Sequence, residues 1–462
     1  MFARSSARLV WAGKSSLIKD NPAPFREIER IYPHPLDQNN PLFSEEVDIN
    51  VSRTGISSPN IFIQGDNLNV LASLLQQGYR GKIDLIYIDP PYLSSHDYTS
   101  RIIVGNGNNK QSLGRSVFQD VWANSLDAYL DEVYPRLMLM KELLSETGSI
   151  FVHLDWHVSH YVKLLLDEVF SSQNFINEIV WCYGGGSGSK KHFHRKHDLI
   201  FWYANTGSYI FNPQYRPYSQ GTIQRGLTKV KGDKYRLNEK GALMQDWWTD
   251  INKILSPTAQ ENLKFPTQKP KALLRRIIAA ASHPGSLVAD FYAGSGTTIE
   301  VCEEMGRNWL ACDSSNLALQ TSSKRLIFNK AQGFKILRLE ENEQNPIGQP
   351  DLSCKLRSEV FNERESHLVV SLESYHPSPE NIGKLKPNSD SSLFIDFWEI
   401  DLNYNGAVFN SDLQVLRKNS IDHEIAMEIN LTLPKAPKPK IAVKVWDIFG
   451  ENTVKVLELI SP

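Results

Sequence analysis

From about residue 60 onward, apolar positions follow two alternating rhythms along the chain. Short continuous apolar runs, such as NIFIQGD (60–66) and KIDLIYID (82–89), predict buried strands. Between such runs apolar residues recur every three or four positions, as in the stripe from Leu126 to Leu144, and predict helices. The alternation predicts an α/β fold with a doubly wound, mainly parallel sheet covered by helices on both faces.

The same pattern assigns elements as far as residue 313. Strands are predicted at GSIFVHLD (148–155), NEIVWCY (177–183), SLVADF (286–291) and NWLACD (308–313). Helices are predicted at NLNVLASLLQQG (67–78), SHYVKLLLDEVF (159–170), PKALLRRIIAAAS (270–282) and TTIEVCEEMG (297–306). The polar stretch VGNGNNKQSLG (104–114) is expected to be a loop, and Leu9–Trp11 a short strand in an ordered arm.

Two stretches interrupt the rhythm and divide the chain. Residues 184–264 are rich in Gly, Lys, Arg and aromatic residues, and residues 336–352 are typical of a linker. Beyond the linker, alternating apolar residues at 427–433 and 441–445 and the Asn405-Gly406 turn signal predict strands. We therefore expect an N-terminal arm at 1–59, a main domain formed by 60–183 and 265–335, an insert at 184–264, the linker at 336–352, and a β-rich module at 353–462.

Composition reveals one locally basic segment and argues against several classes of protein. The 462-residue chain has a formal net charge of −2, so any nucleic-acid signal must be local. Within 184–240, eleven Lys and Arg against three Asp and Glu give a local net charge of +8. The four scattered cysteines argue against a zinc ribbon or a disulfide framework and fit a reducing compartment. The chain contains no run of 18 apolar residues, so no membrane-spanning helix is predicted. The histidines at 192, 194 and 197 lack an acid or cysteine to complete a metal site.

A strand, a glycine turn and a helix follow one another in LVADFYAGSGTT. The strand ends at Asp290, and Gly294 and Gly296 permit a tight turn that lets a ligand approach the backbone. A second strand ends at Asp313, 23 residues after Asp290, where a carboxylate can accept hydrogen bonds from ribose hydroxyls. Ile299 replaces the third glycine of the dinucleotide fingerprint, so a nucleoside without a pyrophosphate, such as S-adenosylmethionine, suits the pattern better. A glycine turn without a ligand is the alternative.

The second motif is Asp89-Pro90-Pro91-Tyr92, which follows a predicted central strand. Ligands of open α/β sheets bind at this edge. The Asp89 carboxylate and the Pro90 carbonyl can accept hydrogen bonds from an exocyclic amino group, and the Tyr92 ring can stack on a heterocycle. Such a grip orients the nitrogen lone pair toward an electrophilic methyl group. A sharp turn with Tyr92 packed in the core is the alternative.

The two motifs in this order resemble the β class of amino-methylating DNA methyltransferases, in which DPPY precedes the cofactor motif. DFYAGSGTT is similar to the version in modification subunits of type III restriction systems, and FPTQKPKALLRRII, LVWAGK, GDNLNVL and TGSIFVHLD also look like this family. The resemblance runs from about residue 60 to 330 and is weaker over 184–264, where target recognition lies in such families. It implies a Rossmann-like methyltransferase domain that uses S-adenosylmethionine, with a target-recognition insert at 184–264.

The resemblance also implies a role for each matching residue. Asp89 and the Pro90 carbonyl would hold the target amino group, and Tyr92 would stack on the flipped base. Cofactor contacts are implied for Asp66, Thr267, Lys269, Asp290, Phe291, Tyr292, Gly294, Gly296, Thr297 and Asp313.

Within that cofactor set the resemblance suggests approximate places. Thr267 and Lys269 of TQKP would lie near the cofactor carboxylate, and Asp66 near its sulfonium or adenine end. Phe291 or Tyr292 would pack against the cofactor. Asp313 would take the ribose hydroxyls, although many relatives have Glu at that position.

An amino group inside duplex DNA cannot reach a pocket at a sheet edge, so the target base must be flipped out. The segments SKKHFHRKHD and QRGLTKVKGDKYR mix cations with aromatic residues and are candidates for phosphate contact and base insertion. The candidate DNA-binding residues are Lys190, Lys191, Arg195, Lys196, Arg225, Lys229 and Lys231. A solvated charged loop is the alternative.

We therefore expect a site-specific methyltransferase acting on N6 of adenine in double-stranded DNA, in a restriction-modification or related defence system. Within this family an initial Asp in DPPY is more usual in adenine enzymes, and Ser in cytosine enzymes. N4-cytosine methylation, a non-catalytic DNA-binding module, and methylation of RNA or protein are the alternatives, whereas a deaminase would need a PCxxC zinc element. A prokaryotic, cytoplasmic, DNA-associated location is expected, and a restriction partner subunit and a homodimer both stay open.

Overall fold

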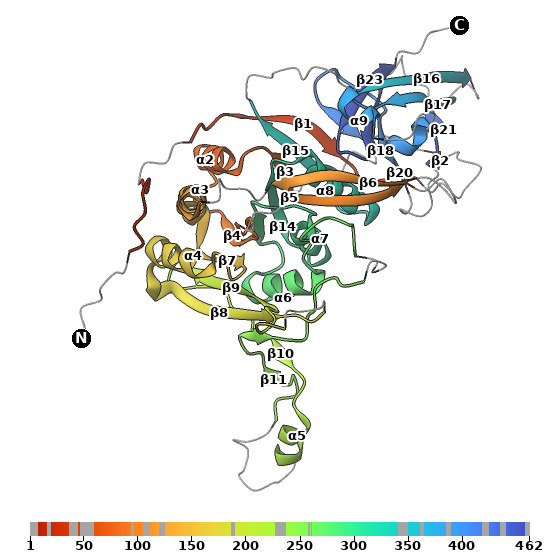
Figure 1. Ribbon diagram of the computed structural model, residues 1–462. Helices are drawn as coiled ribbons and strands as arrows, with labels where there is room; N and C mark the ends of the chain where they lie inside the picture. The colour runs from red at the N-terminus through yellow and green to blue at the C-terminus, as the bar shows by residue number, and fades with distance from the viewer. Residues whose placement is uncertain are drawn as a thin grey trace.

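The computed structural model describes residues 8–15, 20–36, 45–46, 60–93, 97–104, 111–119, 125–185, 190–226, 237–256, 259, 261–340, 350–360, 365–384, 390–417, 425–434 and 440–457. In that part of the chain an 11-stranded sheet forms the centre of the molecule (Figure 1). Its strands, in spatial order, are β12 (Trp247–Trp248), β8 (Phe175–Cys182), β9 (His197–Ala204), β7 (Leu144–Leu154), β4 (Ile83–Ile88), β13 (Leu287–Asp290), β14 (Asn308–Asp313), β3 (Ile61–Gln64), β15 (Phe334–Leu339), β1 (Phe25–Ile31) and β19 (Phe409–Ser411). Strand β9 is antiparallel to β7 and β8, and β1 is antiparallel to β15, whereas the remaining neighbours are parallel. The predicted fold class is confirmed.

Helices cover both faces of this sheet, as expected. One face packs against α2 (Asn67–Gln76), α3 (Leu126–Leu143) and α4 (Ser159–Leu166), and the other against α6 (Lys271–Ala281), α7 (Thr297–Glu304) and α8 (Asn316–Phe328). Alternate side chains of β4 serve the two layers, because Ile86 and Ile88 join the first core and Leu85 and Tyr87 the second. Short helical turns η3 (Asp167–Ser171) and η4 (Ser172–Asn174) follow α4.

The register of β4 and β13 fixes the place of the site. The two strands are neighbours and parallel, with Val288 opposite Leu85, and β14 lies beside β13. The carboxyl ends of all three strands therefore meet at one edge of the sheet. The two motifs found in the sequence follow β4 and β13 at this edge.

A β-hairpin includes both ends of the predicted loop after the DPPY motif. Strand β5 (Asp97–Val104) pairs with β6 (Gln111–Gln119), so the loop prediction is wrong for residues 104 and 111–114, while 105–110 lie outside the described residues. Ile102 and Leu113 pack into a core that belongs to the C-terminal module. The polar sequence predicted a loop because the surface that buries Ile102 and Leu113 belongs to residues about 300 positions later in the chain.

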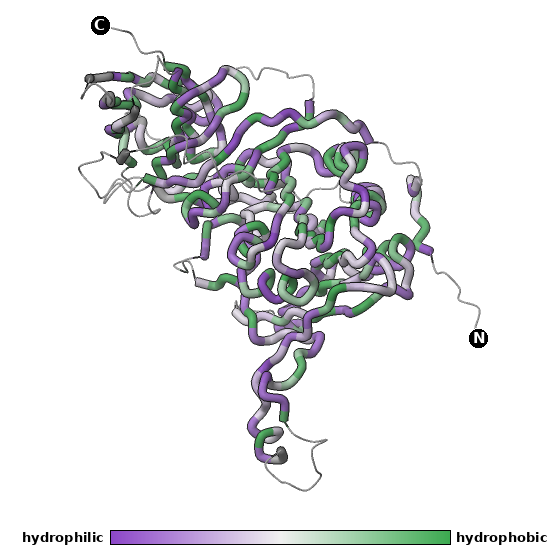
Figure 2. The backbone as a smooth tube through the Cα atoms, turned by 180° about the vertical axis from the view of Figure 1, so that it is seen from behind, coloured by the Kyte–Doolittle hydropathy of each residue, from purple (hydrophilic) through white to green (hydrophobic). Residues whose placement is uncertain are grey.

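The predicted insert contributes directly to the central sheet. Strand β9, HDLIFWYA, lies within 184–264 and is almost wholly buried between β7 and β8. Farther along, β10 (Tyr215–Arg216), β11 (Ala242–Leu243) and α5 (Gln220–Gly226) project from the body as an arm (Figure 1). The arm is largely hydrophilic along its length (Figure 2). The part that leaves the sheet thus begins after residue 204.

The C-terminal region is β-rich, as predicted. One sheet has the spatial strand order β16 (Asp351–Val360), β17 (Glu365–His376), β21 (Glu428–Pro434) and β2 (Glu45–Glu46). A second sheet has the order β20 (Leu413–Leu416), β18 (Ile395–Asp401), β22 (Ile441–Asp447) and β23 (Asn452–Leu457). The short helices α9 (Pro379–Ile382) and η6 (Ser391–Phe394) join them. The predicted turn at Asn405-Gly406 is confirmed, since Asn405 Oδ1 accepts hydrogen bonds from the backbone of Ala407 and Val408.

Several boundaries differ from the sequence analysis. Residues 336–339 belong to strand β15 instead of a linker. Leu9–Trp11 is not a strand: this stretch is irregular and held by side chains, with Trp11 Nε1 donating to Asp131 and Lys14 Nζ to Glu168. The four cysteines are free thiols. Among the described residues, no helix has both the length and the apolar character needed to cross a membrane.

Candidate active site

A cavity of about 500 Å³ lies where the carboxyl ends of β4, β13 and β14 meet. Both sequence motifs contribute to its wall. The predicted catalytic and cofactor residues that line it are Asp66, Asp89, Pro90, Pro91, Tyr92, Thr267, Lys269, Asp290, Phe291, Tyr292, Gly294, Thr297 and Asp313. Of the predicted set, Gly296 alone is absent from the wall. A cavity of this size suits a small-molecule cofactor.

At the β4 end, two side chains of the chain itself hold the Asp89 carboxylate. The Tyr92 hydroxyl donates to Oδ1 and the Lys269 ammonium donates to Oδ2. Lys269 Nζ also lies 5.4 Å from the centroid of the Tyr92 ring. Burial, and then the charge of Asp89, raise the pKa of Tyr92 well above its ordinary value, so the phenol keeps its proton and donates.

Lys269 lies at the DPPY end of the cavity. The resemblance implied a position near the cofactor carboxylate; in this structure the Lys269 ammonium pairs with Asp89, and the Lys269 side chain is 11% exposed. Its neighbour Thr267 has a φ of +60° and donates through Oγ1 to the Pro266 carbonyl, 2.6 Å away. The TQKP segment therefore reaches the DPPY end of the cavity.

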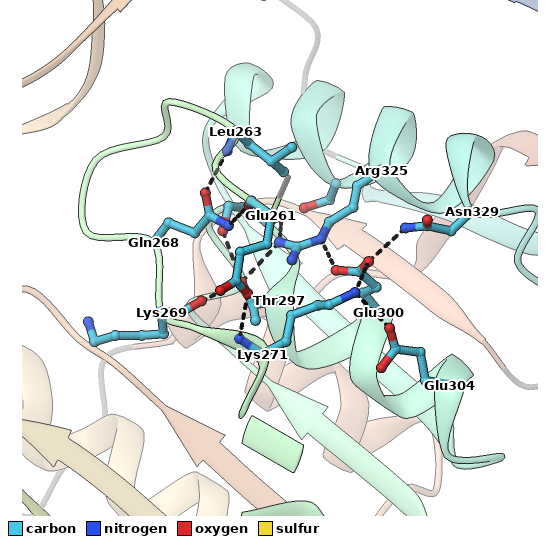
Figure 3. Close-up of polar contacts among 12 residues, drawn as sticks. Glu261, Leu263, Gln268, Lys269, Lys271, Thr297, Glu300, Glu304, Arg325 and Asn329 are labelled. Atoms are coloured by element: carbon cyan, nitrogen blue, oxygen red, sulfur yellow. Dashed lines mark hydrogen bonds and ion pairs between the residues drawn. The ribbon is translucent and has the colours of Figure 1, made fainter. Parts of the chain in front are cut away.

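A buried polar network fixes the TQKP segment against α7 and α8 (Figure 3). Arg325 donates to Glu300, to the Ser295 carbonyl at 3.0 Å and to Thr297 Oγ1 at 2.9 Å. Thr297 Oγ1 in turn donates to the Lys269 carbonyl at 3.2 Å. Figure 3 shows the Lys269 side chain extending away from this network, which leaves its ammonium available to Asp89.

At the β13 end, the backbone and buried hydroxyls hold the carboxylate of Asp290. Oδ1 accepts from the Tyr292 amide at 3.0 Å, and Oδ2 accepts from Thr298 Oγ1 at 2.5 Å. Asp290 is 3% exposed. Burial raises its pKa to about 7, with a smaller contribution from Asp89 and Asp313.

Asp313 lies on the same wall and shapes the glycine turn. Its Oδ2 accepts from the Gly294 amide and its Oδ1 from the Ser315 amide, each at 2.9 Å. Burial raises the pKa of Asp313. Each oxygen has a second lone pair, so the carboxylate can still accept hydrogen bonds from a ligand.

Gly296 supports the site from behind the wall. It has a φ of +73° at the start of α7, and a Cβ there would lie 2.6 Å from Ser322 Oγ. Phe291 is fully buried in the core while touching the cavity, and its carbonyl accepts from Asn67 Nδ2 at 3.0 Å. The glycine is therefore required for close packing of α7 on α8.

The sequence analysis missed the residues that surround the predicted Asp66 in a charged cluster on the α2–α3 side of the cavity. The buried Arg136 guanidinium donates to Asp66 at 3.0 Å, to Asn67 and to Glu132. Asp66 also caps α2 by accepting from the Leu68 and Asn69 amides. A charged residue inside the apolar stripe of α3 was the available signal.

A second missed group lies behind the DPPY end. The buried His153 of β7 bonds through Nδ1 to the Tyr87 hydroxyl at 2.9 Å and through Nε2 to Asp198 at 3.2 Å. Tyr183 donates to the same Asp198 at 2.8 Å. Burial raises the pKa of Asp198, but its contacts with His153, Lys269 and Tyr183 together bring the pKa below its ordinary value.

The predicted DNA-contacting residues at the start of the insert lie on the surface. Lys190, Lys191 and Arg195 are exposed, and the Arg195 guanidinium lies 4.0 Å from the Trp156 ring centroid. Lys196 donates to the Gly185 carbonyl. Trp156 follows β7 at the same sheet edge as the cavity and is 44% exposed.

Three other predicted contacts cannot be placed. The side chain of Arg225, and Lys229 and Lys231 as a whole, lie outside the described residues. In the described ranges no group of three or more His, Cys, Asp or Glu side chains has a metal-binding arrangement.

Comparison with known proteins gives matches across the region that forms the cavity. The model of the N6/N4 methyltransferase family, described as DNA methylase, matches residues 83–324. The type II methyltransferase M.EcaI of Enterobacter cloacae is 25% identical over 351 residues, covering 63% of this chain and 74% of that protein. The StyLTI Mod subunit, from a type III restriction-modification enzyme of Salmonella typhimurium, is 26% identical over 405 residues, covering 67% of this chain and 62% of that protein. The DNA adenine methyltransferase YhdJ of Escherichia coli is 25% identical over 267 residues, covering 57% and 81%.

Proposed function

Because the chain belongs to the N6/N4 family of DNA methylases, we propose that it methylates N6 of a flipped adenine within a specific double-stranded sequence. A DNA amino-methyltransferase of this kind takes its methyl group from S-adenosylmethionine. The observation that carries the proposal is the Asp89 carboxylate on the cavity wall, held by Tyr92 and Lys269. An amino group of a base needs such an acceptor.

The β13 end of the cavity fits the cofactor. The Asp313 carboxylate faces the wall with lone pairs that ribose hydroxyls can use, and Tyr292 supplies an aromatic surface. The Gly294 amide is already bonded to Asp313, so the turn does not form a cradle for phosphate. These features suit a nucleoside carrying a sulfonium and no pyrophosphate.

The side chains at the β4 end would position the base. Asp89 accepts one hydrogen bond from the exocyclic amino group and the Pro90 carbonyl accepts the other, while Tyr92 stacks on the ring. The amino group competes with Lys269 for the Asp89 carboxylate, since the Lys269 ammonium is one of the two donors that already bond it. S-adenosylmethionine supplies a methyl group activated by its sulfonium. The residues thus act by placing the nitrogen lone pair, which suits a reaction limited by orientation.

Adenine is favoured over cytosine by the initial Asp of the DPPY motif, which within the resembled family is more usual in adenine enzymes. The name of YhdJ, a DNA adenine methyltransferase, agrees with this choice. The test is mass spectrometry of nucleosides from DNA incubated with the purified protein and S-adenosylmethionine. We expect N6-methyladenine. N4-methylcytosine without N6-methyladenine would overturn the adenine assignment, and unmodified DNA would overturn the methylation itself.

We propose that DNA contacts the exposed basic residues and the projecting part of the insert that carries β10, α5 and β11. Lys190, Lys191 and Arg195 lie on the surface beside Trp156, which follows the β7 strand end at the sheet edge of the cavity. Phosphate contacts there would compensate for flipping a base out of the duplex. We propose that 184–264 recognises the target and that 60–183 and 265–335 carry the chemistry.

A restriction partner subunit is a further part of the proposal. The StyLTI Mod subunit belongs to a restriction-modification enzyme, and the chain covers 62% of its length. Co-purification of the tagged chain from its native host, followed by mass spectrometry, would test for such a subunit. Recovery of the chain without a nuclease would argue against it.

A further inference from the structure

The hairpin β5–β6 connects the candidate active site to the C-terminal module. It begins a few residues after Tyr92 and runs to the module, where β20 and β18 lie (Figure 1). Tyr98 and Val117, close to one end of the hairpin, line the cavity. Ile102 and Leu113, close to the other end, pack in the core of the module. The hairpin therefore has one end in each unit.

Near the cavity, the hairpin contacts the segment that carries Lys269. Val117 packs with Phe265 and with Leu317 at the start of α8. The buried Ser100 hydroxyl donates to the Lys264 carbonyl at 2.8 Å. Because Lys264 directly precedes the cavity residue Phe265, the hairpin holds the backbone just before the TQKP segment.

In its middle, the hairpin is tied to the module by Arg115. One Nη atom donates to the Ile448 carbonyl of the module at 2.9 Å, and the other donates to Ser100 Oγ at 3.0 Å. A single guanidinium thus joins the module to the hydroxyl that holds Lys264. Near the tip, Gln111 Nε2 donates to the Lys384 carbonyl, also in the module, at 2.9 Å.

The module itself is firmly attached to the main domain through α8. Gln320 donates to the Asp447 carbonyl at 2.7 Å and to Asp396 at 3.0 Å, and Lys324 bonds Asp396 at 2.6 Å. The backbone of Gly450 packs directly on Leu317, because a Cβ there would lie 3.2 Å from the Leu317 backbone. Movement of the hairpin is therefore resisted from both of its ends.

We propose that the C-terminal module anchors the β5–β6 hairpin over the cavity, and that Arg115 is a positioning residue that sets the Phe265–Lys269 segment for cofactor and base. The proposal rests on the proposed function for its benefit to catalysis. The anchoring itself is independent of the reaction, because it is a property of the resting protein. It gives the β-rich module a role in the reaction, although none of the module residues that the structure describes lines the cavity.

The test compares two arginines in the full-length protein. Arg115→Gln removes the link between module and hairpin. Arg417→Gln is the matched control, since Arg417 also donates to backbone carbonyls, those of Ser392 and Ile395, but within the module. Three quantities are measured for each variant: hydrogen–deuterium exchange in 97–104 and 111–119, calorimetric affinity for S-adenosylmethionine, and kcat and KM on DNA.

For Arg115→Gln we expect exchange in the hairpin to rise about 10-fold, the cofactor Kd to rise several-fold and kcat to fall about 10-fold. Arg417→Gln should leave all three within about two-fold. Wild-type values in Arg115→Gln, or equal changes in Arg417→Gln, would overturn the anchoring proposal. If Arg115→Gln does not fold, Gln111→Ala replaces it, with a smaller change expected in the same direction. A wild-type protein that binds cofactor but modifies no DNA would refute the proposed function alone, because exchange and cofactor affinity do not depend on turnover.

Discussion

The strand ends that meet at the cavity hold their carboxylates in two different ways. At the ends of β13 and β14, the backbone amides of Tyr292 and Gly294 and the buried hydroxyl of Thr298 bond Asp290 and Asp313. After β4, the hydrogen bonds that the described residues give to Asp89 come from two long side chains, Tyr92 and Lys269. One half of the cavity is held by backbone amides and a buried hydroxyl, and the other by long side chains that can rotate.

This difference matches what each half is proposed to bind. A cofactor used in every turnover profits from a preformed site, because little ordering entropy is lost on binding. A flipped base competes with the existing contacts of Asp89, and a lysine with four rotatable bonds can leave Asp89 without moving the backbone. The structure thus separates a rigid cofactor half from an exchangeable base half.

The largest expected effect tests the exchangeable half. Asp89→Ala removes the acceptor for the amino group, so turnover should fall by about 1,000-fold or more. Calorimetric affinity for S-adenosylmethionine should stay within about two-fold, because the cofactor half is held separately. Comparable loss of cofactor affinity would show that the two halves are one unit, and normal turnover would contradict the role of Asp89.

Next in size is a pH effect in the rigid half. Burial raises the pKa of Asp290 from 3.8 to about 7, so the folded protein keeps this proton when the unfolded chain has already lost it. That contribution to stability is present below about pH 4 and is lost as pH rises through 7. Asp290→Asn cannot titrate, so its stability relative to wild type should rise by about 4 kcal/mol between pH 4 and pH 8.

Urea unfolding of both proteins across this pH range measures the difference. Subtraction of the two curves removes the titration of every shared group. A difference that stays flat with pH would mean that the Asp290 carboxylate is not destabilised by burial.

A somewhat smaller effect concerns packing beneath the rigid half. Gly296→Ala places a Cβ against Ser322 at a φ of +73° and should reduce the free energy of unfolding by about 3 kcal/mol. Cofactor affinity should fall with it. Gly306→Ala is the matched control, because Gly306 also has a positive φ, +66°, but open space around the added methyl, and its loss of stability should be only about 1 kcal/mol. Equal stability in the two variants would contradict the tight α7–α8 contact.

The smallest expected effect again concerns the exchangeable half. Tyr92→Phe keeps the stacking ring but removes the hydroxyl that donates to Asp89, so kcat should fall about 10-fold while KM for DNA changes little. Steady-state kinetics on a defined duplex measures both constants. A kcat at the wild-type level would show that Lys269 alone is enough to place the carboxylate.

The sequence predicted what depends on local pattern and on neighbouring strand ends. Parallel strands that end at Asp89, Asp290 and Asp313 had to bring those residues to one edge, and the fold does so. Long-range pairings were not accessible in the same way. The apolar strand β9 was assigned to the insert because a basic segment precedes it. The partner of Lys269, Asp89, is 180 residues away in the chain.

The hairpin illustrates the limit most clearly. Its sequence is polar and glycine-rich, and such a pattern predicts a loop unless a second surface buries the alternate side chains. That surface is the C-terminal module, which covers Ile102 and Leu113. No periodicity within 97–119 encodes it.

The edge of the central sheet has a consequence for how the protein is made. Strand β1 pairs on one side with β19, which lies some 380 residues later in the chain, and the buried Glu29 of β1 bonds Lys444 at 2.5 Å. During synthesis on the ribosome, β1 emerges long before β19 and Lys444. Until these are made, β1 has one unpaired edge and the Glu29 carboxylate lacks its ion-pair partner. An unpaired edge of this kind invites pairing with other chains. Nascent chains stalled before residue 411 should therefore be the form most dependent on chaperones, because the sheet is complete only after β19 has been made.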